Sequence, residues 1–318
     1  MITGGAGFVG LNLVDYFFKT LSEQNTNMAL LIVDNLSSGN LDLLNSIVER
    51  YGYELNGDRI KFYKMDIGDK EVENVLKESD YVIHLAAQTG VIPSMEDPVK
   101  DAEVNILGTL NLLNLSVKHK IKKFIFASSA APLGEQKPPL NEEKIPNPLS
   151  PYGASKLSAE GYCKAYFGSF GLNTIILRFS NLYGIYSYHK GSVIAEFFRR
   201  IMKNKELIIY GDGKQTRDFL FAGDLSEFIF NLINNDYEFR GEVFQLGTGV
   251  ETSINELVDM IKEVVKRDIN IKFEPERKGE IKRNYTDISK VKKLLNYNPK
   301  TNLIYGLKKT YNWFKENI

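Results

Sequence analysis

Three glycines at the start of the chain are the first residues whose spacing suggests chemistry. Gly4, Gly7 and Gly10 follow the pattern G-x-x-G-x-x-G. Glycine lets the backbone turn sharply and approach a pyrophosphate, whose negative charge is favoured at the N-terminus of the helix that follows. The spacing predicts a dinucleotide-binding turn, with a helix over residues 8–20 opening from it.

An acidic residue follows at the end of the next apolar run. Asp34 stands 24 positions after Gly10 and directly follows the run 29–33. A carboxylate there can accept hydrogen bonds from both hydroxyls of an adenine ribose and would repel a 2′-phosphate, so NAD is favoured over NADP. Asp66, after the run 60–65, could meet the adenine edge. Either aspartate could equally be a helix cap or a turn residue.

A second group of residues could carry out acid–base chemistry. Tyr152 and Lys156 lie four positions apart on a helix predicted over 151–170, so they share one face. A neighbouring ammonium favours the phenolate, and we expect the pKa of Tyr152 to fall from about 10 toward neutrality. Such a base suits the deprotonation of a hydroxyl during hydride transfer. Ser129 could share a proton with the phenol, although a Tyr-x-x-x-Lys pair alone is often only an exposed helical pair.

The elements that must position these residues alternate along the first half of the chain. Short apolar runs predict strands over 29–33, 60–65, 81–85, 123–127 and 173–178. Helical periodicity separates them, as in 99–118 and 151–170. This alternation predicts a Rossmann-type, doubly wound parallel α/β sheet covered by helices on both faces. Ligands of such sheets bind at the carboxyl ends of the strands.

The second half of the chain is less regular and predicts a smaller, mixed α/β domain. The elements expected there are two helices and a strand, over 191–203, 254–266 and 242–246. We expect residues 1–178 to form an NAD-binding domain and residues 179–318 to bind the substrate. Part of 215–248 is expected to rejoin the first sheet.

Composition narrows the class of protein. The 318 residues suffice for one large or two modest domains, and 40 basic residues balance 40 acidic ones. No basic block suggests nucleic acid, and no apolar run reaches the about 18–20 residues that a membrane helix needs. The single cysteine, Cys163, excludes an intramolecular disulfide and fits a cytoplasmic protein. The three histidines lack metal-ligand spacing, so no metal is expected.

Together these motifs resemble the extended short-chain dehydrogenase/reductase family, and within it the nucleotide-sugar epimerases and dehydratases. Besides the glycine loop and the Tyr152–Lys156 pair, the resemblance rests on the segments 33–39, 84–88, 105–109, 211–219 and 277–280. It covers nearly the whole chain and implies NAD as cofactor and a UDP-sugar as substrate. It also implies a homodimer, formed through helices around 99–118 and 151–170.

The resemblance gives each catalytic residue a role. Tyr152 would remove the proton of the sugar 4-hydroxyl while C4 passes hydride to NAD. Lys156 would tune the phenol and hold the nicotinamide ribose, and Ser129 would relay the proton. An epimerase then returns the hydride to the other face of the 4-keto sugar, so NAD is not consumed.

The resemblance also implies the remaining ligand contacts. The residues expected to bind NAD are Gly4, Gly7, Phe8, Val9, Gly10, Asp34, Asn35, Ser38, Gly39, Asp66, Ile67, Leu85, Ala86, Ala87, Thr89, Asn105, Tyr152, Lys156 and Phe179. The residues expected to bind the nucleotide sugar are Ser94, Ser129, Asn181, Val193, Tyr210, Arg217, Arg277 and Glu280. A guanidinium suits bidentate contact with a diphosphate, although either arginine alone could be a solvated surface charge.

Two alanines discriminate among the reactions of this family. Its dehydratases carry an Asp–Glu pair directly after the hydroxyl residue that Ser129 matches, and its UDP-glucuronate decarboxylases carry a Glu at the second of these positions. Here the two positions are Ala130 and Ala131, which cannot move protons. The resemblance therefore favours a UDP-hexose 4-epimerase. The alternatives are a UDP-glucuronate epimerase or decarboxylase, a 4,6-dehydratase, a reductase, or a catalytically silent NAD-binding member.

Three further positions bear on this interpretation. Asn284 matches the position that admits or excludes an N-acetyl group; because asparagine is smaller than the excluding tyrosine, N-acetylhexosamines are expected beside glucose and galactose. Pro132 and Leu133 replace the usual Val-Tyr, so the loop beside Ser129 is expected to run differently. Only three residues precede the glycine loop. A first strand of ordinary length would need about three or four more, and we expect the natural chain to begin earlier.

Overall fold

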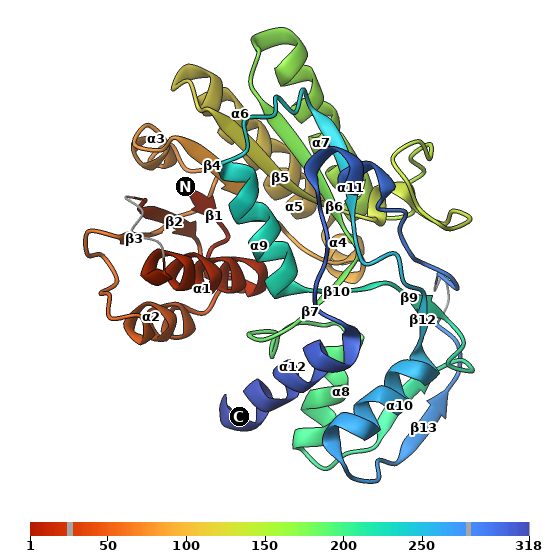
Figure 1. Ribbon diagram of the computed structural model, residues 1–318. Helices are drawn as coiled ribbons and strands as arrows, with labels where there is room; N and C mark the ends of the chain where they lie inside the picture. Colours follow the sequence, from red (N-terminus) through yellow and green to blue (C-terminus); the bar gives the residue numbers. More distant parts are fainter. Residues whose placement is uncertain (24–27, 278–280, 318) are drawn as a thin grey trace. The chain divides into compact units, whose positions relative to one another are not determined.

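A seven-stranded sheet forms the core of the first part of the chain (Figure 1). The computed structural model describes residues 1–23, 28–277 and 281–317. The strand order is β11-β6-β5-β4-β1-β2-β3, and the pairs from β3 through β1 to β5 are parallel. The chain thus moves outward from β1 in both directions, as in a doubly wound fold. The predicted Rossmann-type sheet is confirmed.

The predicted strands appear with small shifts at their ends. The strands of the sheet are β1 (Ile2–Thr3), β2 (Leu30–Asp34), β3 (Ile60–Lys64), β4 (Tyr81–His84), β5 (Lys123–Ser129), β6 (Thr174–Phe179) and β11 (Glu242–Leu246). The accompanying helices are α1 (Phe8–Glu23), α2 (Leu41–Arg50), α3 (Val72–Leu76), α4 (Val91–Glu96), α5 (Pro98–Ala102), α6 (Thr109–Lys118), α7 (Pro151–Phe170) and α9 (Ala222–Ile233). A π-helical segment, Glu103–Gly108, joins α5 to α6.

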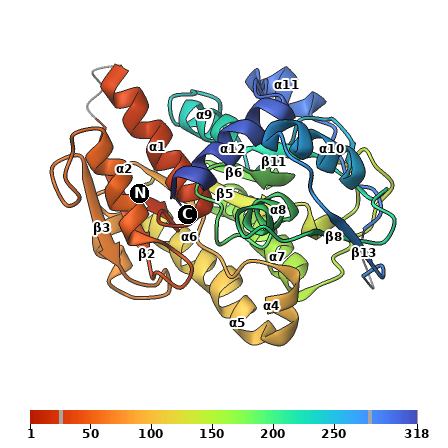
Figure 2. The ribbon, with the colours of Figure 1, turned by 90° about the horizontal axis from the view of Figure 1, so that it is seen from below.

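The sheet buries both of its faces because its strands are apolar on both sides. Alternate residues, such as Val82 and Phe124, form one core with side chains of α3, α6 and α7. On the opposite side α1 and α9 pack through Phe17 and Phe230, whose ring centroids are 5.9 Å apart. Figure 2 shows α4 and α5 beside α7, and these helices are in contact.

The chain divides into two compact units. The first comprises Met1–Glu135, Lys144–Arg178 and Ser226–Phe244, and the second comprises Gln136–Glu143, Phe179–Leu225 and Gln245–Ile318. The strands of the second unit are β7 (Asn181–Tyr183), β8 (Leu207–Tyr210), β9 (Thr216–Arg217), β10 (Phe219–Phe221), β12 (Thr252–Ser253) and β13 (Ile271–Glu274). Its helices are α8 (Val193–Met202), α10 (Ile254–Val265), α11 (Ser289–Leu295) and α12 (Leu303–Asn317). In Figure 1, α8, α10 and α12 gather around a core that includes Phe198, Leu257 and Phe314. The predicted smaller, mixed α/β part is confirmed.

A search of the described residues finds no helix with the length and apolar character needed to cross a membrane.

A buried ion pair fixes α7 on the sheet. The Arg178 guanidinium on β6 donates from Nε and Nη2 to the two carboxylate oxygens of Glu160, over 2.8 and 2.6 Å. Ser128 on β5 donates to the same carboxylate over 2.5 Å. The side chains of the pair are only 4% and 5% exposed. A bidentate contact with this little solvent constrains both position and angle.

Replacing Arg178 with methionine should lower the free energy of unfolding by about 3–5 kcal/mol, because it leaves the buried Glu160 carboxylate uncompensated. Lys122→Met is the matched control. Its pair with Asp80 has side chains 62% and 64% exposed, and such pairs contribute less than about 1 kcal/mol. Urea denaturation of both variants measures the difference. A loss in Arg178→Met no larger than in Lys122→Met would contradict the role of this pair.

Candidate active site

The glycine loop turns where only residues without a side chain fit. Gly4 has a φ of +70°, and a Cβ there would lie 2.7 Å from the backbone nitrogen of Ala86. A Cβ at Gly10 would lie 2.4 Å from the carbonyl oxygen of Gly4. The start of α1, with Phe8 and Val9 as its first two residues, therefore comes directly against the loop. This geometry leaves backbone N–H groups at a helix N-terminus available for an anion.

Asp34 ends β2 and is buried, with 7% of its surface exposed. Its carboxylate oxygens accept hydrogen bonds from the backbone nitrogens of Ala6, over 3.0 Å, and Leu36, over 2.8 Å. Burial raises the pKa of Asp34, and the two N–H bonds partly offset this by lowering it. A carboxylate has about four acceptor positions, so this turn role leaves room for ribose hydroxyls.

The loops after β2 and β3 are joined by side chains. Asn35 donates from Nδ2 to Asp66 over 2.8 Å. Ser38 and Gly39 continue the loop after Asp34, and a Cβ on Gly39 would lie 2.8 Å from an Asp34 oxygen. Ile67, which follows Asp66, is buried. The predicted adenine-side residues thus share the carboxyl ends of two neighbouring strands.

The segment after β4 lies next to the glycine loop. Leu85 donates from its backbone nitrogen to the carbonyl of Thr3 over 3.1 Å, and Ala86 donates to the Thr3 hydroxyl over 3.3 Å. Ala87 and Thr89 belong to the same irregular segment. Another predicted cofactor residue, Asn105, hydrogen-bonds the backbone nitrogen and carbonyl of Gln88 in this segment, each over 2.9 Å. Asn105 is in the π-helical segment, and Phe179 ends β6 and belongs to the second unit.

The three predicted catalytic residues come together in the first unit. Ser129 ends β5, and its hydroxyl hydrogen-bonds the Tyr152 phenol. Tyr152 and Lys156 lie in the first two turns of α7, whose start is capped by the Ser150 hydroxyl. The Lys156 ammonium donates to the carbonyl of Ala127 over 2.9 Å. A strand end and a capped helix N-terminus therefore fix all three groups.

The expected low pKa of Tyr152 is wrong in this structure. Burial raises the pKa of the phenol, the Ser129 hydrogen bond lowers it, and the negative charge of Asp101 raises it further. Burial also lowers the pKa of Lys156 to about 8, although the charges of Asp101 and Glu160 act against this. The loss of hydration is the largest effect on the pKa of both Tyr152 and Lys156. The Lys156 ammonium does not offset it at Tyr152, because it donates to the backbone carbonyl of Ala127.

The loop after Ser129 forms a short 3-10 helix, Ala131–Leu133. Pro132 is the second residue of this turn. At this position a backbone N–H would have no partner within the helix, so the proline ring costs no hydrogen bond. Its carbonyl accepts a hydrogen bond from the backbone nitrogen of Asn147 over 3.0 Å. Ala130 and Ala131 are half-buried and place no ionisable group beside Ser129.

A cavity of about 290 Å³ lies within the second unit. Five of the eight predicted substrate residues line it: Asn181, Val193, Tyr210, Arg217 and Arg277. The Arg277 guanidinium stacks on the Tyr210 ring, with its central carbon 3.7 Å from the ring centroid. Arg217 donates from Nη1 to the carbonyls of Thr216 and Ile281, each over 2.8 Å. These contacts hold both guanidinium groups at the cavity.

The other predicted substrate residues lie elsewhere. Ser129 is in the first unit. Ser94, also in the first unit, is fully buried and donates to the carbonyl of Val91 over 2.7 Å. Glu280 lies outside the described residues.

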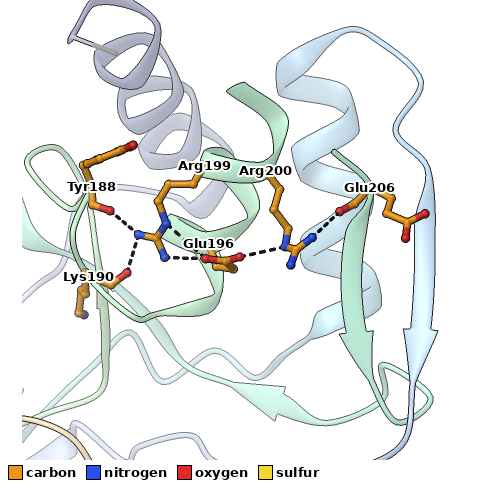
Figure 3. Close-up of polar contacts among 6 residues, drawn as sticks. All are labelled: Tyr188, Lys190, Glu196, Arg199, Arg200 and Glu206. Atoms are coloured by element: carbon orange, nitrogen blue, oxygen red, sulfur yellow. Dashed lines mark hydrogen bonds and ion pairs between the residues drawn. The ribbon is translucent and has the colours of Figure 1, made fainter. Parts of the chain in front are cut away.

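Sequence reasoning missed Ser192, Gln215 and Glu196, which also line the cavity. Gln215 donates to the carbonyl of Tyr210 over 2.8 Å. Glu196 on α8 accepts hydrogen bonds from both Arg199 and Arg200 (Figure 3). Burial raises the pKa of the Glu196 carboxyl. The Arg199 and Arg200 guanidinium groups together lower it by more than burial raises it, so the pKa lies below its usual value. In the sequence, Glu196 stands three and four positions before Arg199 and Arg200, a spacing that indicates an ordinary helical ion pair and gives no sign of a cavity.

Known proteins resemble this chain in both sequence and fold. Residues 1–310 match the GDP-mannose 4,6 dehydratase family. The chain is 36% identical to a UDP-glucose 4-epimerase from Thermotoga maritima solved with UDP-glucose, with a TM-score of 0.87 over 99% of this chain and 98% of that one. It is 33% identical to a UDP-N-acetylglucosamine 4-epimerase from Methanobrevibacter ruminantium in complex with UDP-N-acetylmuramic acid, with a TM-score of 0.90 over 100% and 98%.

A third solved structure includes a dinucleotide. It is a UDP-glucuronic acid 4-epimerase from Bacillus cereus in complex with UDP-glucuronic acid and NAD. It is 29% identical, with a TM-score of 0.88 over 99% of this chain and 98% of that one. By its motifs, its sheet and its match over residues 1–310, this chain belongs to the GDP-mannose 4,6 dehydratase family of extended short-chain dehydrogenases/reductases.

Proposed function

We propose that the protein is an NAD-dependent 4-epimerase of a UDP-hexose. The observation that supports this best is the Ser129–Tyr152–Lys156 group beside two alanines at 130 and 131. Epimerisation at C4 needs one group that removes and returns the 4-hydroxyl proton. Dehydration and decarboxylation need a further acid or base that Ala130 and Ala131 cannot supply.

NAD fits the residues of the first unit. Side chains are excluded from the glycine loop at Gly4 and Gly10, which leaves its backbone free to hold a pyrophosphate. Asp34 has acceptor capacity left for the adenine ribose. Bound NAD would supply the acceptor for the hydride of C4. On this basis we assign cofactor binding to residues 1–178 and nucleotide-sugar binding to residues 179–318.

The protein's own catalytic work is proton transfer at the 4-oxygen. The Tyr152 phenolate accepts the proton of the 4-hydroxyl, and the Ser129 hydroxyl relays it through its hydrogen bond with the phenol. When the 4-keto sugar has turned over, Tyr152 returns the proton to the same oxygen. Lys156 holds a positive charge on the same helix, and its hydrogen bond to the Ala127 carbonyl fixes the position of the ammonium, which would hold the nicotinamide ribose of bound NAD.

The cavity of the second unit suits a nucleoside diphosphate. Arg217 and Arg277 present guanidinium groups, whose planar fork matches phosphate oxygens. Stacking on Tyr210 orients the Arg277 plane. Asn181 adds an amide at the same cavity.

We also propose a cytoplasmic homodimer. Val99, on α5, and Leu107, in the π-helical segment, are 66% and 61% exposed, and Tyr162 on α7 is 40% exposed. Apolar side chains of this size on neighbouring helices suit a second copy of the chain. The single buried thiol, Cys163, is compatible with a reducing compartment.

Replacing Tyr152 with phenylalanine should lower kcat by about 10²–10⁴-fold, because it removes the group that takes and returns the proton. The interconversion of UDP-glucose and UDP-galactose, followed by NMR, measures this. Tyr162→Phe, on the exposed side of the same helix, is the control and should retain activity. Full activity of Tyr152→Phe would refute the proposed mechanism. A 4-keto-6-deoxy sugar or a pentose as product would instead identify a dehydratase or a decarboxylase.

Asn284 should admit N-acetylhexosamines. Its side-chain oxygen is buried and lacks a hydrogen-bond partner among the described residues. Asn284→Tyr should lower the ratio of kcat/KM for UDP-N-acetylglucosamine to that for UDP-galactose by about 10–200-fold, the range that pocket shape achieves. Competition assays with both sugars measure the ratio. If the unmodified protein turns over UDP-galactose well but neither UDP-N-acetylglucosamine nor UDP-N-acetylgalactosamine, this role of Asn284 is ruled out.

A further inference from the structure

A buried carboxylate lies behind the catalytic helix and has no role in the chemistry described so far. Asp101, on α5, is 1% exposed. Its Oδ2 accepts a hydrogen bond from Asn105 Nδ2 over 3.0 Å. Within the described part of the chain its Oδ1 has no hydrogen-bond partner. An ionisable group this deeply buried is costly to keep, so its surroundings indicate what it does.

A chain of hydrogen bonds connects this carboxylate to the backbone of the catalytic tyrosine. Asn105 Nδ2 lies 3.0 Å from Asp101 and 3.1 Å from the Ser155 hydroxyl. The Ser155 hydroxyl in turn donates to the carbonyl of Tyr152 over 3.1 Å. Asn105 and Ser155 are 2% and 3% exposed. The first turn of α7 is therefore tied to α5 through two buried side chains.

The same amide also holds the segment that follows β4. Asn105 Oδ1 accepts from the backbone nitrogen of Gln88 over 2.9 Å, and Nδ2 lies 2.9 Å from the Gln88 carbonyl, so the two Nδ2 hydrogens are shared among Gln88, Asp101 and Ser155. Asn105 lies in the π-helical segment Glu103–Gly108, whose wider turn displaces it from regular α-helical spacing. Asp101 thus orients the Asn105 amide, which contacts Gln88 in the segment after β4 and Ser155 on α7.

The charge of Asp101 also reaches the reacting groups. It raises the pKa of Tyr152 and that of Lys156, in each case beside the larger effect of burial. The other groups that act on the phenol and the ammonium come from β5 and from α7. Ser129 faces the phenol, and Glu160 and Cys163 face the ammonium.

We propose that Asp101 is a positioning residue of the catalytic centre, which aligns the first turn of α7 through Asn105 and Ser155 and places a negative charge behind Tyr152 and Lys156. This rests on the proposed function, in which Tyr152 is the base. An epimerase must return the proton that it removes. A negative charge behind the phenol opposes its permanent ionisation and helps to keep Lys156 protonated.

The test compares Asp101→Asn with Glu103→Gln. Asparagine keeps an acceptor for Asn105 but removes the charge. Glu103→Gln removes a charge two residues away, from a side chain that is 56% exposed. Because the negative charge raises the pKa of Tyr152, Asp101→Asn should move the acid limb of the kcat–pH profile to lower pH. Glu103→Gln should leave the limb where it is.

Two further measurements keep the proposal testable if Asp101→Asn folds poorly. Ser155→Ala breaks the hydrogen-bond chain without changing charge, so kcat should fall about 10–100-fold with the acid limb unmoved. Independently of turnover, near-ultraviolet titration of the phenolate reports the ionisation of Tyr152, with the matching Tyr152→Phe protein subtracted. It should shift to lower pH in Asp101→Asn.

The proposal is overturned if Asp101→Asn titrates like the unmodified protein, if Glu103→Gln shifts the limb equally, or if Ser155→Ala retains full kcat. These outcomes are distinct from failure of the proposed function. Full activity of Tyr152→Phe would remove the base itself. Inactivity of Tyr152→Phe with an unshifted Asp101→Asn would remove only the role of Asp101.

Discussion

The first unit depends on the contact between α1 and the glycine loop, where a Cβ on Gly10 would fall 2.4 Å from the Gly4 carbonyl. The central strand before this loop has only two residues, so side chains must help to hold it. Thr3 bonds His84 Nδ1 over 2.8 Å, and His84 Nε2 bonds Thr109 over 2.9 Å. Burial lowers the pKa of His84 to about 3, so the ring is neutral. Since Thr109 donates its proton to Asn105, His84 carries its hydrogen on Nε2 and accepts from Thr3.

This series of hydrogen bonds ends on the backbone carbonyl of Asn105. Asn105 is the point where it meets the second path, from Asp101 to Ser155. Buried polar networks are stable only when nearly every member is paired, which makes such a core specific in its geometry. In this unit, residues beside the glycine loop and residues at the start of α7 therefore belong to one buried polar network.

The local sequence predicts the helices and strands whose formation depends on short-range periodicity. The strands and α7 were predicted because apolar runs and the Ser150–Pro151 start are local signals. The π-helical turn at Glu103–Gly108 was not, because a single wider turn shifts the helical phase only once, and the few residues on either side of it do not reveal that shift. The pKa of Tyr152 was missed because burial depends on contacts across the fold. The pairing of Glu160 with Arg178 could not be deduced, since nothing local relates a helix to the following strand. The cavity residues came from motif resemblance: Gln215 lies within the matched segment 211–219 but was given no role, and Glu196 lies outside the matched segments.

The most direct test of the proposed reaction follows the hydrogen on C4. UDP-galactose carrying deuterium at C4 is incubated with the purified protein, and the products are identified by NMR and mass spectrometry. Epimerisation predicts UDP-glucose that retains deuterium at C4, with no solvent hydrogen incorporated and no NADH accumulating. Loss of the label, its replacement by solvent hydrogen, or a product other than the C4 epimer would contradict the proposed 4-epimerase.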